Sequence, residues 1–146
     1  MSIKTLKKLP SLKNKLVFLR VDFNVDIENG KIQEDFRIIA GLDTINFLLK
    51  KGARLIIATH LGEPKGSPEP EYSVKPVAVR LQKLLHQPVR FLPETIGPNV
   101  RQAVAAMKAG DIIMLENLRF NAGELSNDNK FAKELASLAD IYVNDA

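Results

Sequence analysis

The sequence predicts a three-layer α-β-α protein, in which helices cover both faces of a mainly parallel β-sheet. Short runs rich in apolar and β-branched residues alternate with longer segments of helical periodicity, which is the pattern of parallel β-α-β units. Several of the short runs are apolar almost throughout, as in strands buried on both faces. The length of 146 residues favours one core, so we expect a single domain over residues 1–146.

Five strands of this sheet can be assigned from the apolar runs. They are predicted at residues 16–21, 55–58, 89–92, 112–115 and 141–143. After the first strand, Asn29 and Gly30 separate the runs 25–27 and 31–32, and this dipeptide favours a type I′ turn. We therefore expect a small hairpin to project from the end of the first strand.

Four helices fill the intervals between the strands. The first has apolar residues at helical spacing over positions 38–49 and ends at Gly52. Ser73 is the predicted cap of the second helix. The third is predicted to begin at Pro98 and to end just before Gly110, and the fourth to be capped by Asn127.

Composition excludes several classes of protein. The chain has 45% hydrophobic residues, a formal charge of +4 and no cysteine, which excludes a disulfide scaffold, a thiolate nucleophile and a zinc site built on sulfur. Residues 1–4 lead into polar sequence and no stretch approaches the ~20 apolar residues of a membrane span. We expect a soluble cytoplasmic protein with no membrane contact. The lysines are scattered rather than clustered, which disfavours nucleic acid as the partner.

Polar residues follow four of the five predicted strands. In open α/β sheets ligands bind beyond the carboxyl ends of the strands, and parallel strands would bring these side chains to one rim. The rim residues are Asp22, Asn24, Thr59, His60, Glu116, Asn117, Arg119, Asn144 and Asp145. Arg37 adds a guanidinium at the start of the first helix, where the helix dipole favours an anion. Together they form a plausible cradle for a small phosphorylated hydroxy acid.

Each rim residue also has a structural interpretation. Asp22 and Asn24 can serve as Asx residues that satisfy a turn, Arg37 can be a solvated charge, and His60 can be a loop histidine without a ligand. Glu116 and Asn117 are assigned a structural role first, as supports for the loop that carries Arg119. A glycine-rich phosphate loop is absent from the sequence, so no nucleotide site is predicted.

Five motifs, in order and spread over nearly the whole chain, resemble the N-terminal domain of phosphoglycerate kinases. They are RVDFNV at 20–25, DFRI at 35–38, THLG at 59–62, ENLRF at 116–120 and YVNDA at 142–146. The resemblance implies a Rossmann-like domain and an enzyme of glycolysis and gluconeogenesis. Such an enzyme moves a phosphoryl group reversibly between 1,3-bisphosphoglycerate and ADP, giving 3-phosphoglycerate and ATP.

The resemblance also assigns roles to residues of this chain. Arg37 would be catalytic, stabilising the transferring group, while His60 and Arg119 would help to hold the distal phosphate. The implied substrate-binding residues are Asp22, Phe23, Asn24, Arg37, His60, Leu61, Gly62, Glu63 and Arg119, and no metal ligand is implied. Mg²⁺ and ATP or ADP would bind a second domain, in cis or on a complementing chain, and full-length members are expected to be monomeric.

Two departures from the family pattern qualify these expectations. Glu63 stands where the family has an arginine that binds phosphate, and its carboxylate would repel a phosphate by about 4 kcal/mol at ~4 Å and an effective dielectric near 20. The chain also ends where the family continues, so we expect an incomplete domain that lacks its final elements and is inactive alone. The alternative is a non-catalytic module that binds another phosphorylated ligand; a basic nucleic-acid-binding domain is the weakest hypothesis.

Overall fold

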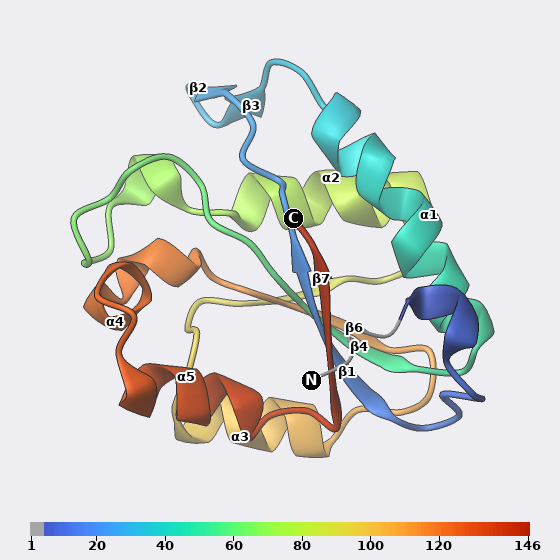
Figure 1. Cartoon of the computed structure of the whole chain (residues 1–146). Coiled ribbons are helices and arrows are strands. Elements are labelled where there is room, and N and C mark those ends of the chain that lie inside the picture. Colours follow the sequence, from blue (N-terminus) through green and yellow to red (C-terminus); the bar gives the residue numbers. More distant parts are fainter. Residues whose placement is uncertain (1–4) are drawn as a thin grey trace.

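A single twisted sheet of five parallel strands runs through the centre of the protein, in the order β5-β6-β4-β1-β7 (Figure 1). The computed structural model describes residues 5–146. The strands of this sheet are β1 (Leu16–Val21), β4 (Arg54–Ala58), β5 (Arg90–Leu92), β6 (Ile112–Leu115) and β7 (Ile141–Asp145). β1 lies between β4 and β7, with Phe18 opposite both Ile56 and Tyr142. The predicted parallel sheet is confirmed, and its strands differ from the predicted ranges by at most two residues at an end.

Residues 5–146 also form five α-helices and three short 3₁₀ turns, of which the first turn precedes β1 and the others lie between strands. The helices are α1 (Phe36–Lys50), α2 (Lys75–Leu85), α3 (Pro98–Ala105), α4 (Ala122–Leu125) and α5 (Asn129–Ala136). The turns are η1 (Leu6–Lys8), η2 (Pro70–Tyr72) and η3 (Leu118–Phe120). No helix within residues 5–146 is both long and apolar enough to cross a membrane.

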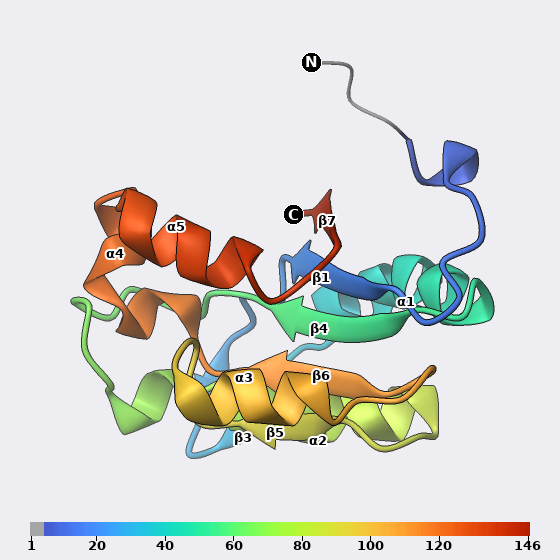
Figure 2. The same cartoon turned by 90° about the horizontal axis from the view of Figure 1, so that it is seen from below.

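The two faces of the sheet bury separate apolar clusters. One cluster joins alternate residues of β1 and β4, such as Leu19 and Ile57, to Ile45 of α1 and Leu81 of α2. The other takes the intervening residues of the same strands, such as Phe18 and Ile56, and joins them to α3 and α5. In Figure 2 α3 and α5 accordingly lie on one side of the sheet and α2 lies on the other. The predicted three-layer arrangement is therefore confirmed.

The hairpin after the first strand is present as β2 (Ile27–Glu28) and β3 (Lys31–Ile32). Asn29 and Gly30 have φ values of 51° and 73°, which are the left-handed conformations that a type I′ turn needs at both central positions. This local prediction is confirmed because it depends only on the two residues of the turn.

Three predicted helix boundaries are wrong. Val74, not Ser73, is the N-cap of α2; the Ser73 hydroxyl donates to the Glu116 carboxylate at 2.7 Å, and its oxygen accepts from the Lys75 amide at 3.3 Å. α3 ends at Ala105, and Gly110 belongs to a separate turn that precedes β6. Asp128 caps α5 through the amides of Lys130 and Phe131, whereas Asn127 has a left-handed φ of 53°. α4 and the three 3₁₀ turns were not predicted.

Candidate functional site

The candidate site lies where the carboxyl ends of three adjacent strands meet. The loops after β1, β4 and β6 carry residues 22–24, 59–62 and 117–119, and these strands are neighbours in the order β6-β4-β1. Hydrogen bonds and ion pairs connect most of the predicted polar site residues into one continuous network. The parallel sheet thus brings together side chains that are up to about a hundred positions apart in sequence.

Asp22 and Arg37 form one end of this network. Nη1 of Arg37 donates to both carboxylate oxygens of Asp22, at 3.0 and 2.8 Å. Asp22 also accepts from the backbone amide of Asn24 at 3.2 Å, so it stabilises the turn and holds the arginine at the same time. A small open pocket of about 180 Å³ between β1 and α1 is lined by both side chains and by Asp145. The Arg37 guanidinium therefore stands at an accessible pocket near the N-terminus of a 15-residue helix, a place that favours an anion.

Gly62 is the central link of the network. Its amide donates to Oδ1 of Asn24 at 2.9 Å, and its carbonyl accepts from Nη1 of Arg119 at 3.2 Å. Gly62 has φ +58°, and a Cβ added there would overlap the ring of Tyr72. Only glycine meets both demands, because other residues are strained at positive φ and would displace the ring. The HLG motif therefore has a structural reason for its glycine.

His60 lies between the positive charges of the site. Its Nδ1 is 3.0 Å from Nη2 of Arg20, and since a guanidinium can only donate, Nδ1 is the acceptor. Burial, then the Arg119 and Arg20 guanidinium groups, lower the pKa of His60 below its ordinary value of 6.5. At neutral pH the ring is therefore uncharged and carries its proton on Nε2, where it can donate to a ligand oxygen.

Glu116 and Asn117 form the buried support under these loops. The Asn117 side chain is 0% exposed; it accepts from the amides of Leu61 and Arg119 and donates to the carbonyls of Leu61 and Tyr72. Glu116 accepts from the amides of Val74 and Asn117 and from the Ser73 hydroxyl. These contacts confirm the structural role that the sequence assigned to the pair first.

Phe23 and Leu61 are core residues behind the site. Phe23 is 0% and Leu61 2% exposed, and the amide of Phe23 donates to Oγ1 of Thr59 at 3.0 Å. Their buried side chains anchor the two loops to the core and expose almost no surface to a ligand. A direct part for either residue in ligand binding stays a prediction.

Glu63 and Asn144 stand outside the network. Glu63 is exposed, and within residues 5–146 no ion pair joins it to Lys65. The backbone amide of Lys65 donates to the carboxylate of Glu69 at 3.1 Å. Asn144 is also exposed and accepts only from the amide of Ala146.

The sequence analysis missed two charged members of the network, Arg20 and Glu124. Nη2 of Arg20 and Nε of Arg119 lie 3.6 and 3.4 Å from the Glu124 carboxylate. Arg20 could have been found as the one charge within the first strand's apolar run. Glu124 follows Asn121 by three positions, and this spacing is typical of a helix N-terminus. The same pattern could therefore have predicted α4.

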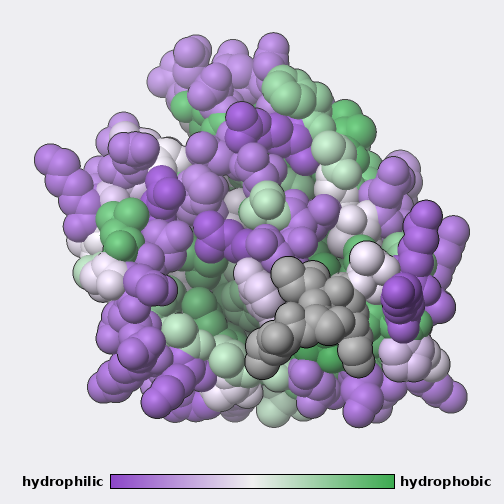
Figure 3. Space-filling view, viewed as in Figure 1, coloured by the Kyte–Doolittle hydropathy of each residue, from purple (hydrophilic) through white to green (hydrophobic). Residues whose placement is uncertain are grey.

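Hydrophilic residues gather over the upper part of the face in Figure 3, around the place where β1 and β7 end in Figure 1. A groove of about 760 Å³ lies between the β2-β3 hairpin and α2 and is lined by none of the predicted site residues. Within residues 5–146 no three His, Asp or Glu side chains are grouped so that they could hold a metal ion. The rim carries guanidinium groups, a neutral imidazole and amides, which recognise oxyanions, together with the carboxylates of Asp22 and Glu124, which pair with the arginines.

The chain is similar in sequence to proteins named phosphoglycerate kinase. The family model "Phosphoglycerate kinase" matches residues 6–146. The phosphoglycerate kinase of Fervidobacterium nodosum is 53% identical over 135 residues, which are 92% of this chain and 34% of that protein. That of Geobacter metallireducens is 50% identical over 147 residues, covering 100% of this chain and 37% of that protein.

Solved structures agree with the sequence comparison. Phosphoglycerate kinase from Coxiella burnetii has a TM-score of 0.83 and 40% identity, over 96% of this chain and 34% of that chain. The enzyme from Pyrococcus horikoshii OT3 also has a TM-score of 0.83, with 36% identity over 93% of this chain and 35% of that chain. The chain thus spans about a third of the length of these relatives. Because the family model matches almost every residue and the fold and motifs agree with it, this chain belongs to the phosphoglycerate kinase family.

Proposed function

We propose that residues 1–146 supply the part of a phosphoglycerate kinase that binds 3-phosphoglycerate and 1,3-bisphosphoglycerate. Residues 1–4 of this proposed domain lie outside the described part of the chain. The observation that carries the proposal is the network itself, in which Asp22, Asn24, Arg37, His60, Gly62 and Arg119 are held at one rim. The reaction would be the reversible transfer of a phosphoryl group between 1,3-bisphosphoglycerate and ADP, in the cytoplasm.

The geometry suits a substrate that carries negative charge at both ends. Arg37, held by Asp22 at the start of α1, would lie against the carboxyl or acyl phosphate end and stabilise the transferring group. Arg119 and the Nε2 proton of neutral His60 would hold the distal phosphate, while Asp22 and Asn24 contact the glycerate part. Phosphoryl transfer depends mainly on positioning and on stabilisation of charge, which guanidinium groups on fixed loops can provide.

No nucleotide site is predicted for this chain, because its sequence has no glycine-rich phosphate loop. We therefore propose that the nucleotide binds elsewhere in the protein, in cis or on a complementing chain. By itself the 146-residue chain is expected to transfer no phosphate to ADP.

Titration calorimetry with 3-phosphoglycerate tests the proposed site. Arg119→Ala and Arg37→Ala should each weaken binding by tenfold or more, because a charge-assisted hydrogen bond contributes about 1.5–3 kcal/mol. Arg101→Ala is the matched control, since Arg101 pairs with Glu134 on the surface at 3.4 Å and belongs to no site loop. Equal affinities in all four proteins would show that 3-phosphoglycerate does not use this rim.

Glu63 favours a second candidate function. Its exposed carboxylate follows directly after Gly62, so it adds a negative charge beside the loop that would receive a phosphate. A module of the same fold that binds a different phosphorylated ligand, without catalysis, would explain such a residue. In that case the chain would bind a phosphorylated compound of lower negative charge more tightly than 3-phosphoglycerate in the same calorimetric titration.

A further inference from the structure

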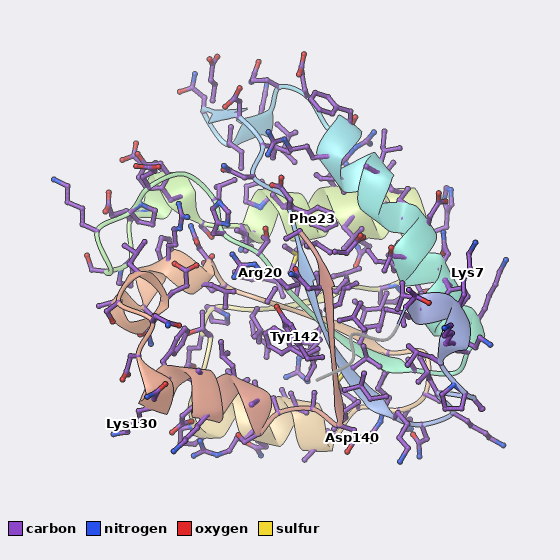
Figure 4. The ribbon with its side chains drawn as sticks, in the orientation of Figure 1. Lys7, Arg20, Phe23, Lys130, Asp140 and Tyr142 are labelled. Atoms are coloured by element: carbon purple, nitrogen blue, oxygen red, sulfur yellow. The ribbon has the colours of Figure 1, made fainter. Side chains whose placement is uncertain are left out.

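One carboxylate, that of Glu124, contacts two arginines of the candidate site. Oε1 lies 3.6 Å from Nη2 of Arg20, and Oε2 lies 3.4 Å from Nε of Arg119. All three side chains are largely buried, at 18%, 19% and 23% exposure for Glu124, Arg20 and Arg119. Figure 4 shows Arg20 on the side of β1 that faces α4 and α5. The pairs are thus shielded from the solvent that weakens ordinary surface salt bridges.

The backbone that carries Glu124 is tightly fixed. The Asn121 side chain caps α4 by accepting from the amide of Gly123 at 2.9 Å, and the carbonyl of Gly123 accepts from Asp128 at 2.9 Å. A Cβ added to Gly123 would lie 2.8 Å from Cβ of Phe131, so α4 packs directly against α5. Glu124 is therefore presented to the arginines from a rigid corner rather than from a mobile loop.

Arg119 contacts two neutral groups as well as this carboxylate. Its amide is held by Asn117 and its Nη1 donates to the carbonyl of Gly62. Arg119 Nε and Glu124 Oε2 are both buried and have no hydrogen-bond partner, although they lie 3.4 Å apart. The attraction between them is thus mainly charge on charge, and removing the carboxylate would leave an uncompensated guanidinium charge.

The same carboxylate offsets repulsion within the cluster. Arg20 and Arg119 both lower the pKa of His60, which shows that their charges converge on the imidazole, while Glu124 and Asp22 act in the opposite direction. Without Glu124 two positive charges would stand around a neutral ring with no counter-charge between them. Each guanidinium would then gain from turning outward into solvent.

We propose that Glu124 is a positioning residue, which holds Arg119 in the orientation that receives a phosphate and holds Arg20 beside His60, without touching the ligand itself. The inference rests on the proposed function of the rim. A guanidinium that is already fixed loses less side-chain entropy on binding, and this preorganisation raises affinity. The role is distinct from that of Asn117, which positions the backbone of the same loop.

Calorimetry with 3-phosphoglycerate on Glu124 variants tests the proposal. Glu124→Ala should weaken binding about tenfold, and Glu124→Gln, which keeps the size of the side chain but removes its charge, should weaken binding between about threefold and tenfold. Glu134→Ala, which breaks the surface pair of the same length to Arg101, should bind like the wild type. In an Arg119→Ala background, Glu124→Ala should weaken binding by clearly less than tenfold, because only the contact of Glu124 with Arg20 is left to lose. A Glu124→Ala protein that binds as tightly as the wild type, or a full tenfold loss that persists in the Arg119→Ala background, would overturn the proposal.

A second measurement needs no ligand. The ¹⁵N relaxation of the Arg119 Nε–H group should show a rigid side chain in the wild type and in Glu134→Ala, and a mobile one in Glu124→Ala and, to a smaller degree, in Glu124→Gln. If the wild type does not bind 3-phosphoglycerate but Arg119 is released on loss of Glu124, the proposed function fails and the positioning role stands. If Arg119 stays rigid in both Glu124 variants, the positioning role fails whatever the affinities are. Should Glu124→Ala not fold, the Glu124→Gln measurement decides.

Discussion

Asn117 gives the sharpest test of how the site is built. Its side chain makes four hydrogen bonds, at 3.2 Å from the Leu61 amide, 2.7 Å to the Leu61 carbonyl, 2.9 Å to the Tyr72 carbonyl and 3.0 Å from the Arg119 amide. Asn117→Ala removes all four hydrogen bonds at once. The amide and carbonyl of Leu61 would then be buried without partners, since Leu61 is only 2% exposed.

The expected loss can be worked out from these groups. A buried polar group without a partner costs about 1–3 kcal/mol, so the two Leu61 groups together should lower the free energy of unfolding by about 4 kcal/mol. The Tyr72 and Arg119 groups are partly exposed and can turn to water, so they add less. For a chain of this size, a change of this magnitude should lower the melting temperature by roughly 12 °C.

Urea unfolding followed by circular dichroism measures this change, with the m-value checked for constancy between variants. The control is Asn99→Ala, because Asn99 makes a single exposed hydrogen bond to Glu94 at 2.8 Å and its loss should stay within about 0.5 kcal/mol. A loss below about 1 kcal/mol for Asn117→Ala, or one equal to the control, would refute the view that this side chain holds the two loops together.

Three further outcomes are expected. Gly62→Ala should unfold at a lower temperature and lose phosphate affinity together, because φ +58° strains alanine and its Cβ would displace the Tyr72 ring; an unchanged melting temperature would contradict the close contact. The pKa of His60, measured by NMR, should lie below 6.5. Between this pKa and 6.5 the unfolded chain binds more protons than the folded one, so the free energy of unfolding should rise with pH up to about 6.5 and fall as the pH is lowered toward the folded pKa. Arg119→Ala should raise the pKa of His60. Glu63→Arg should tighten 3-phosphoglycerate binding about tenfold, with a gain that shrinks as salt is raised; no gain by calorimetry would show that Glu63 lies away from the phosphate.

Short-range features of this protein could be predicted from the sequence because near neighbours decide them. Asn29 and Gly30 specify their own turn, and they adopt it. The apolar runs of β1, β4 and β6 are typical of strands buried on both faces, and their alternation with helical segments favours a parallel sheet. From parallel strands it followed that residues 22–24, 59–62 and 117–119 would meet at one rim, which the structure confirms.

Only the tertiary structure determined which hydrogen-bond and ion-pair partners the side chains of the site have. The Ser73 oxygen accepts from the Lys75 amide at the start of α2, as local rules allow, but its hydroxyl donates to Glu116, which lies 43 positions away in sequence and 2.7 Å away in space. Arg20 and Glu124 are 104 positions apart and meet only because η3 and α4 follow β6 across the sheet. A side chain's best partner is set by strand order and by the packing of loops over the sheet, and neither leaves a periodic signal in the sequence. The sequence by itself therefore determined the sheet, its rim and most of the residues on it, while the tertiary structure determined how the charges of that rim balance one another.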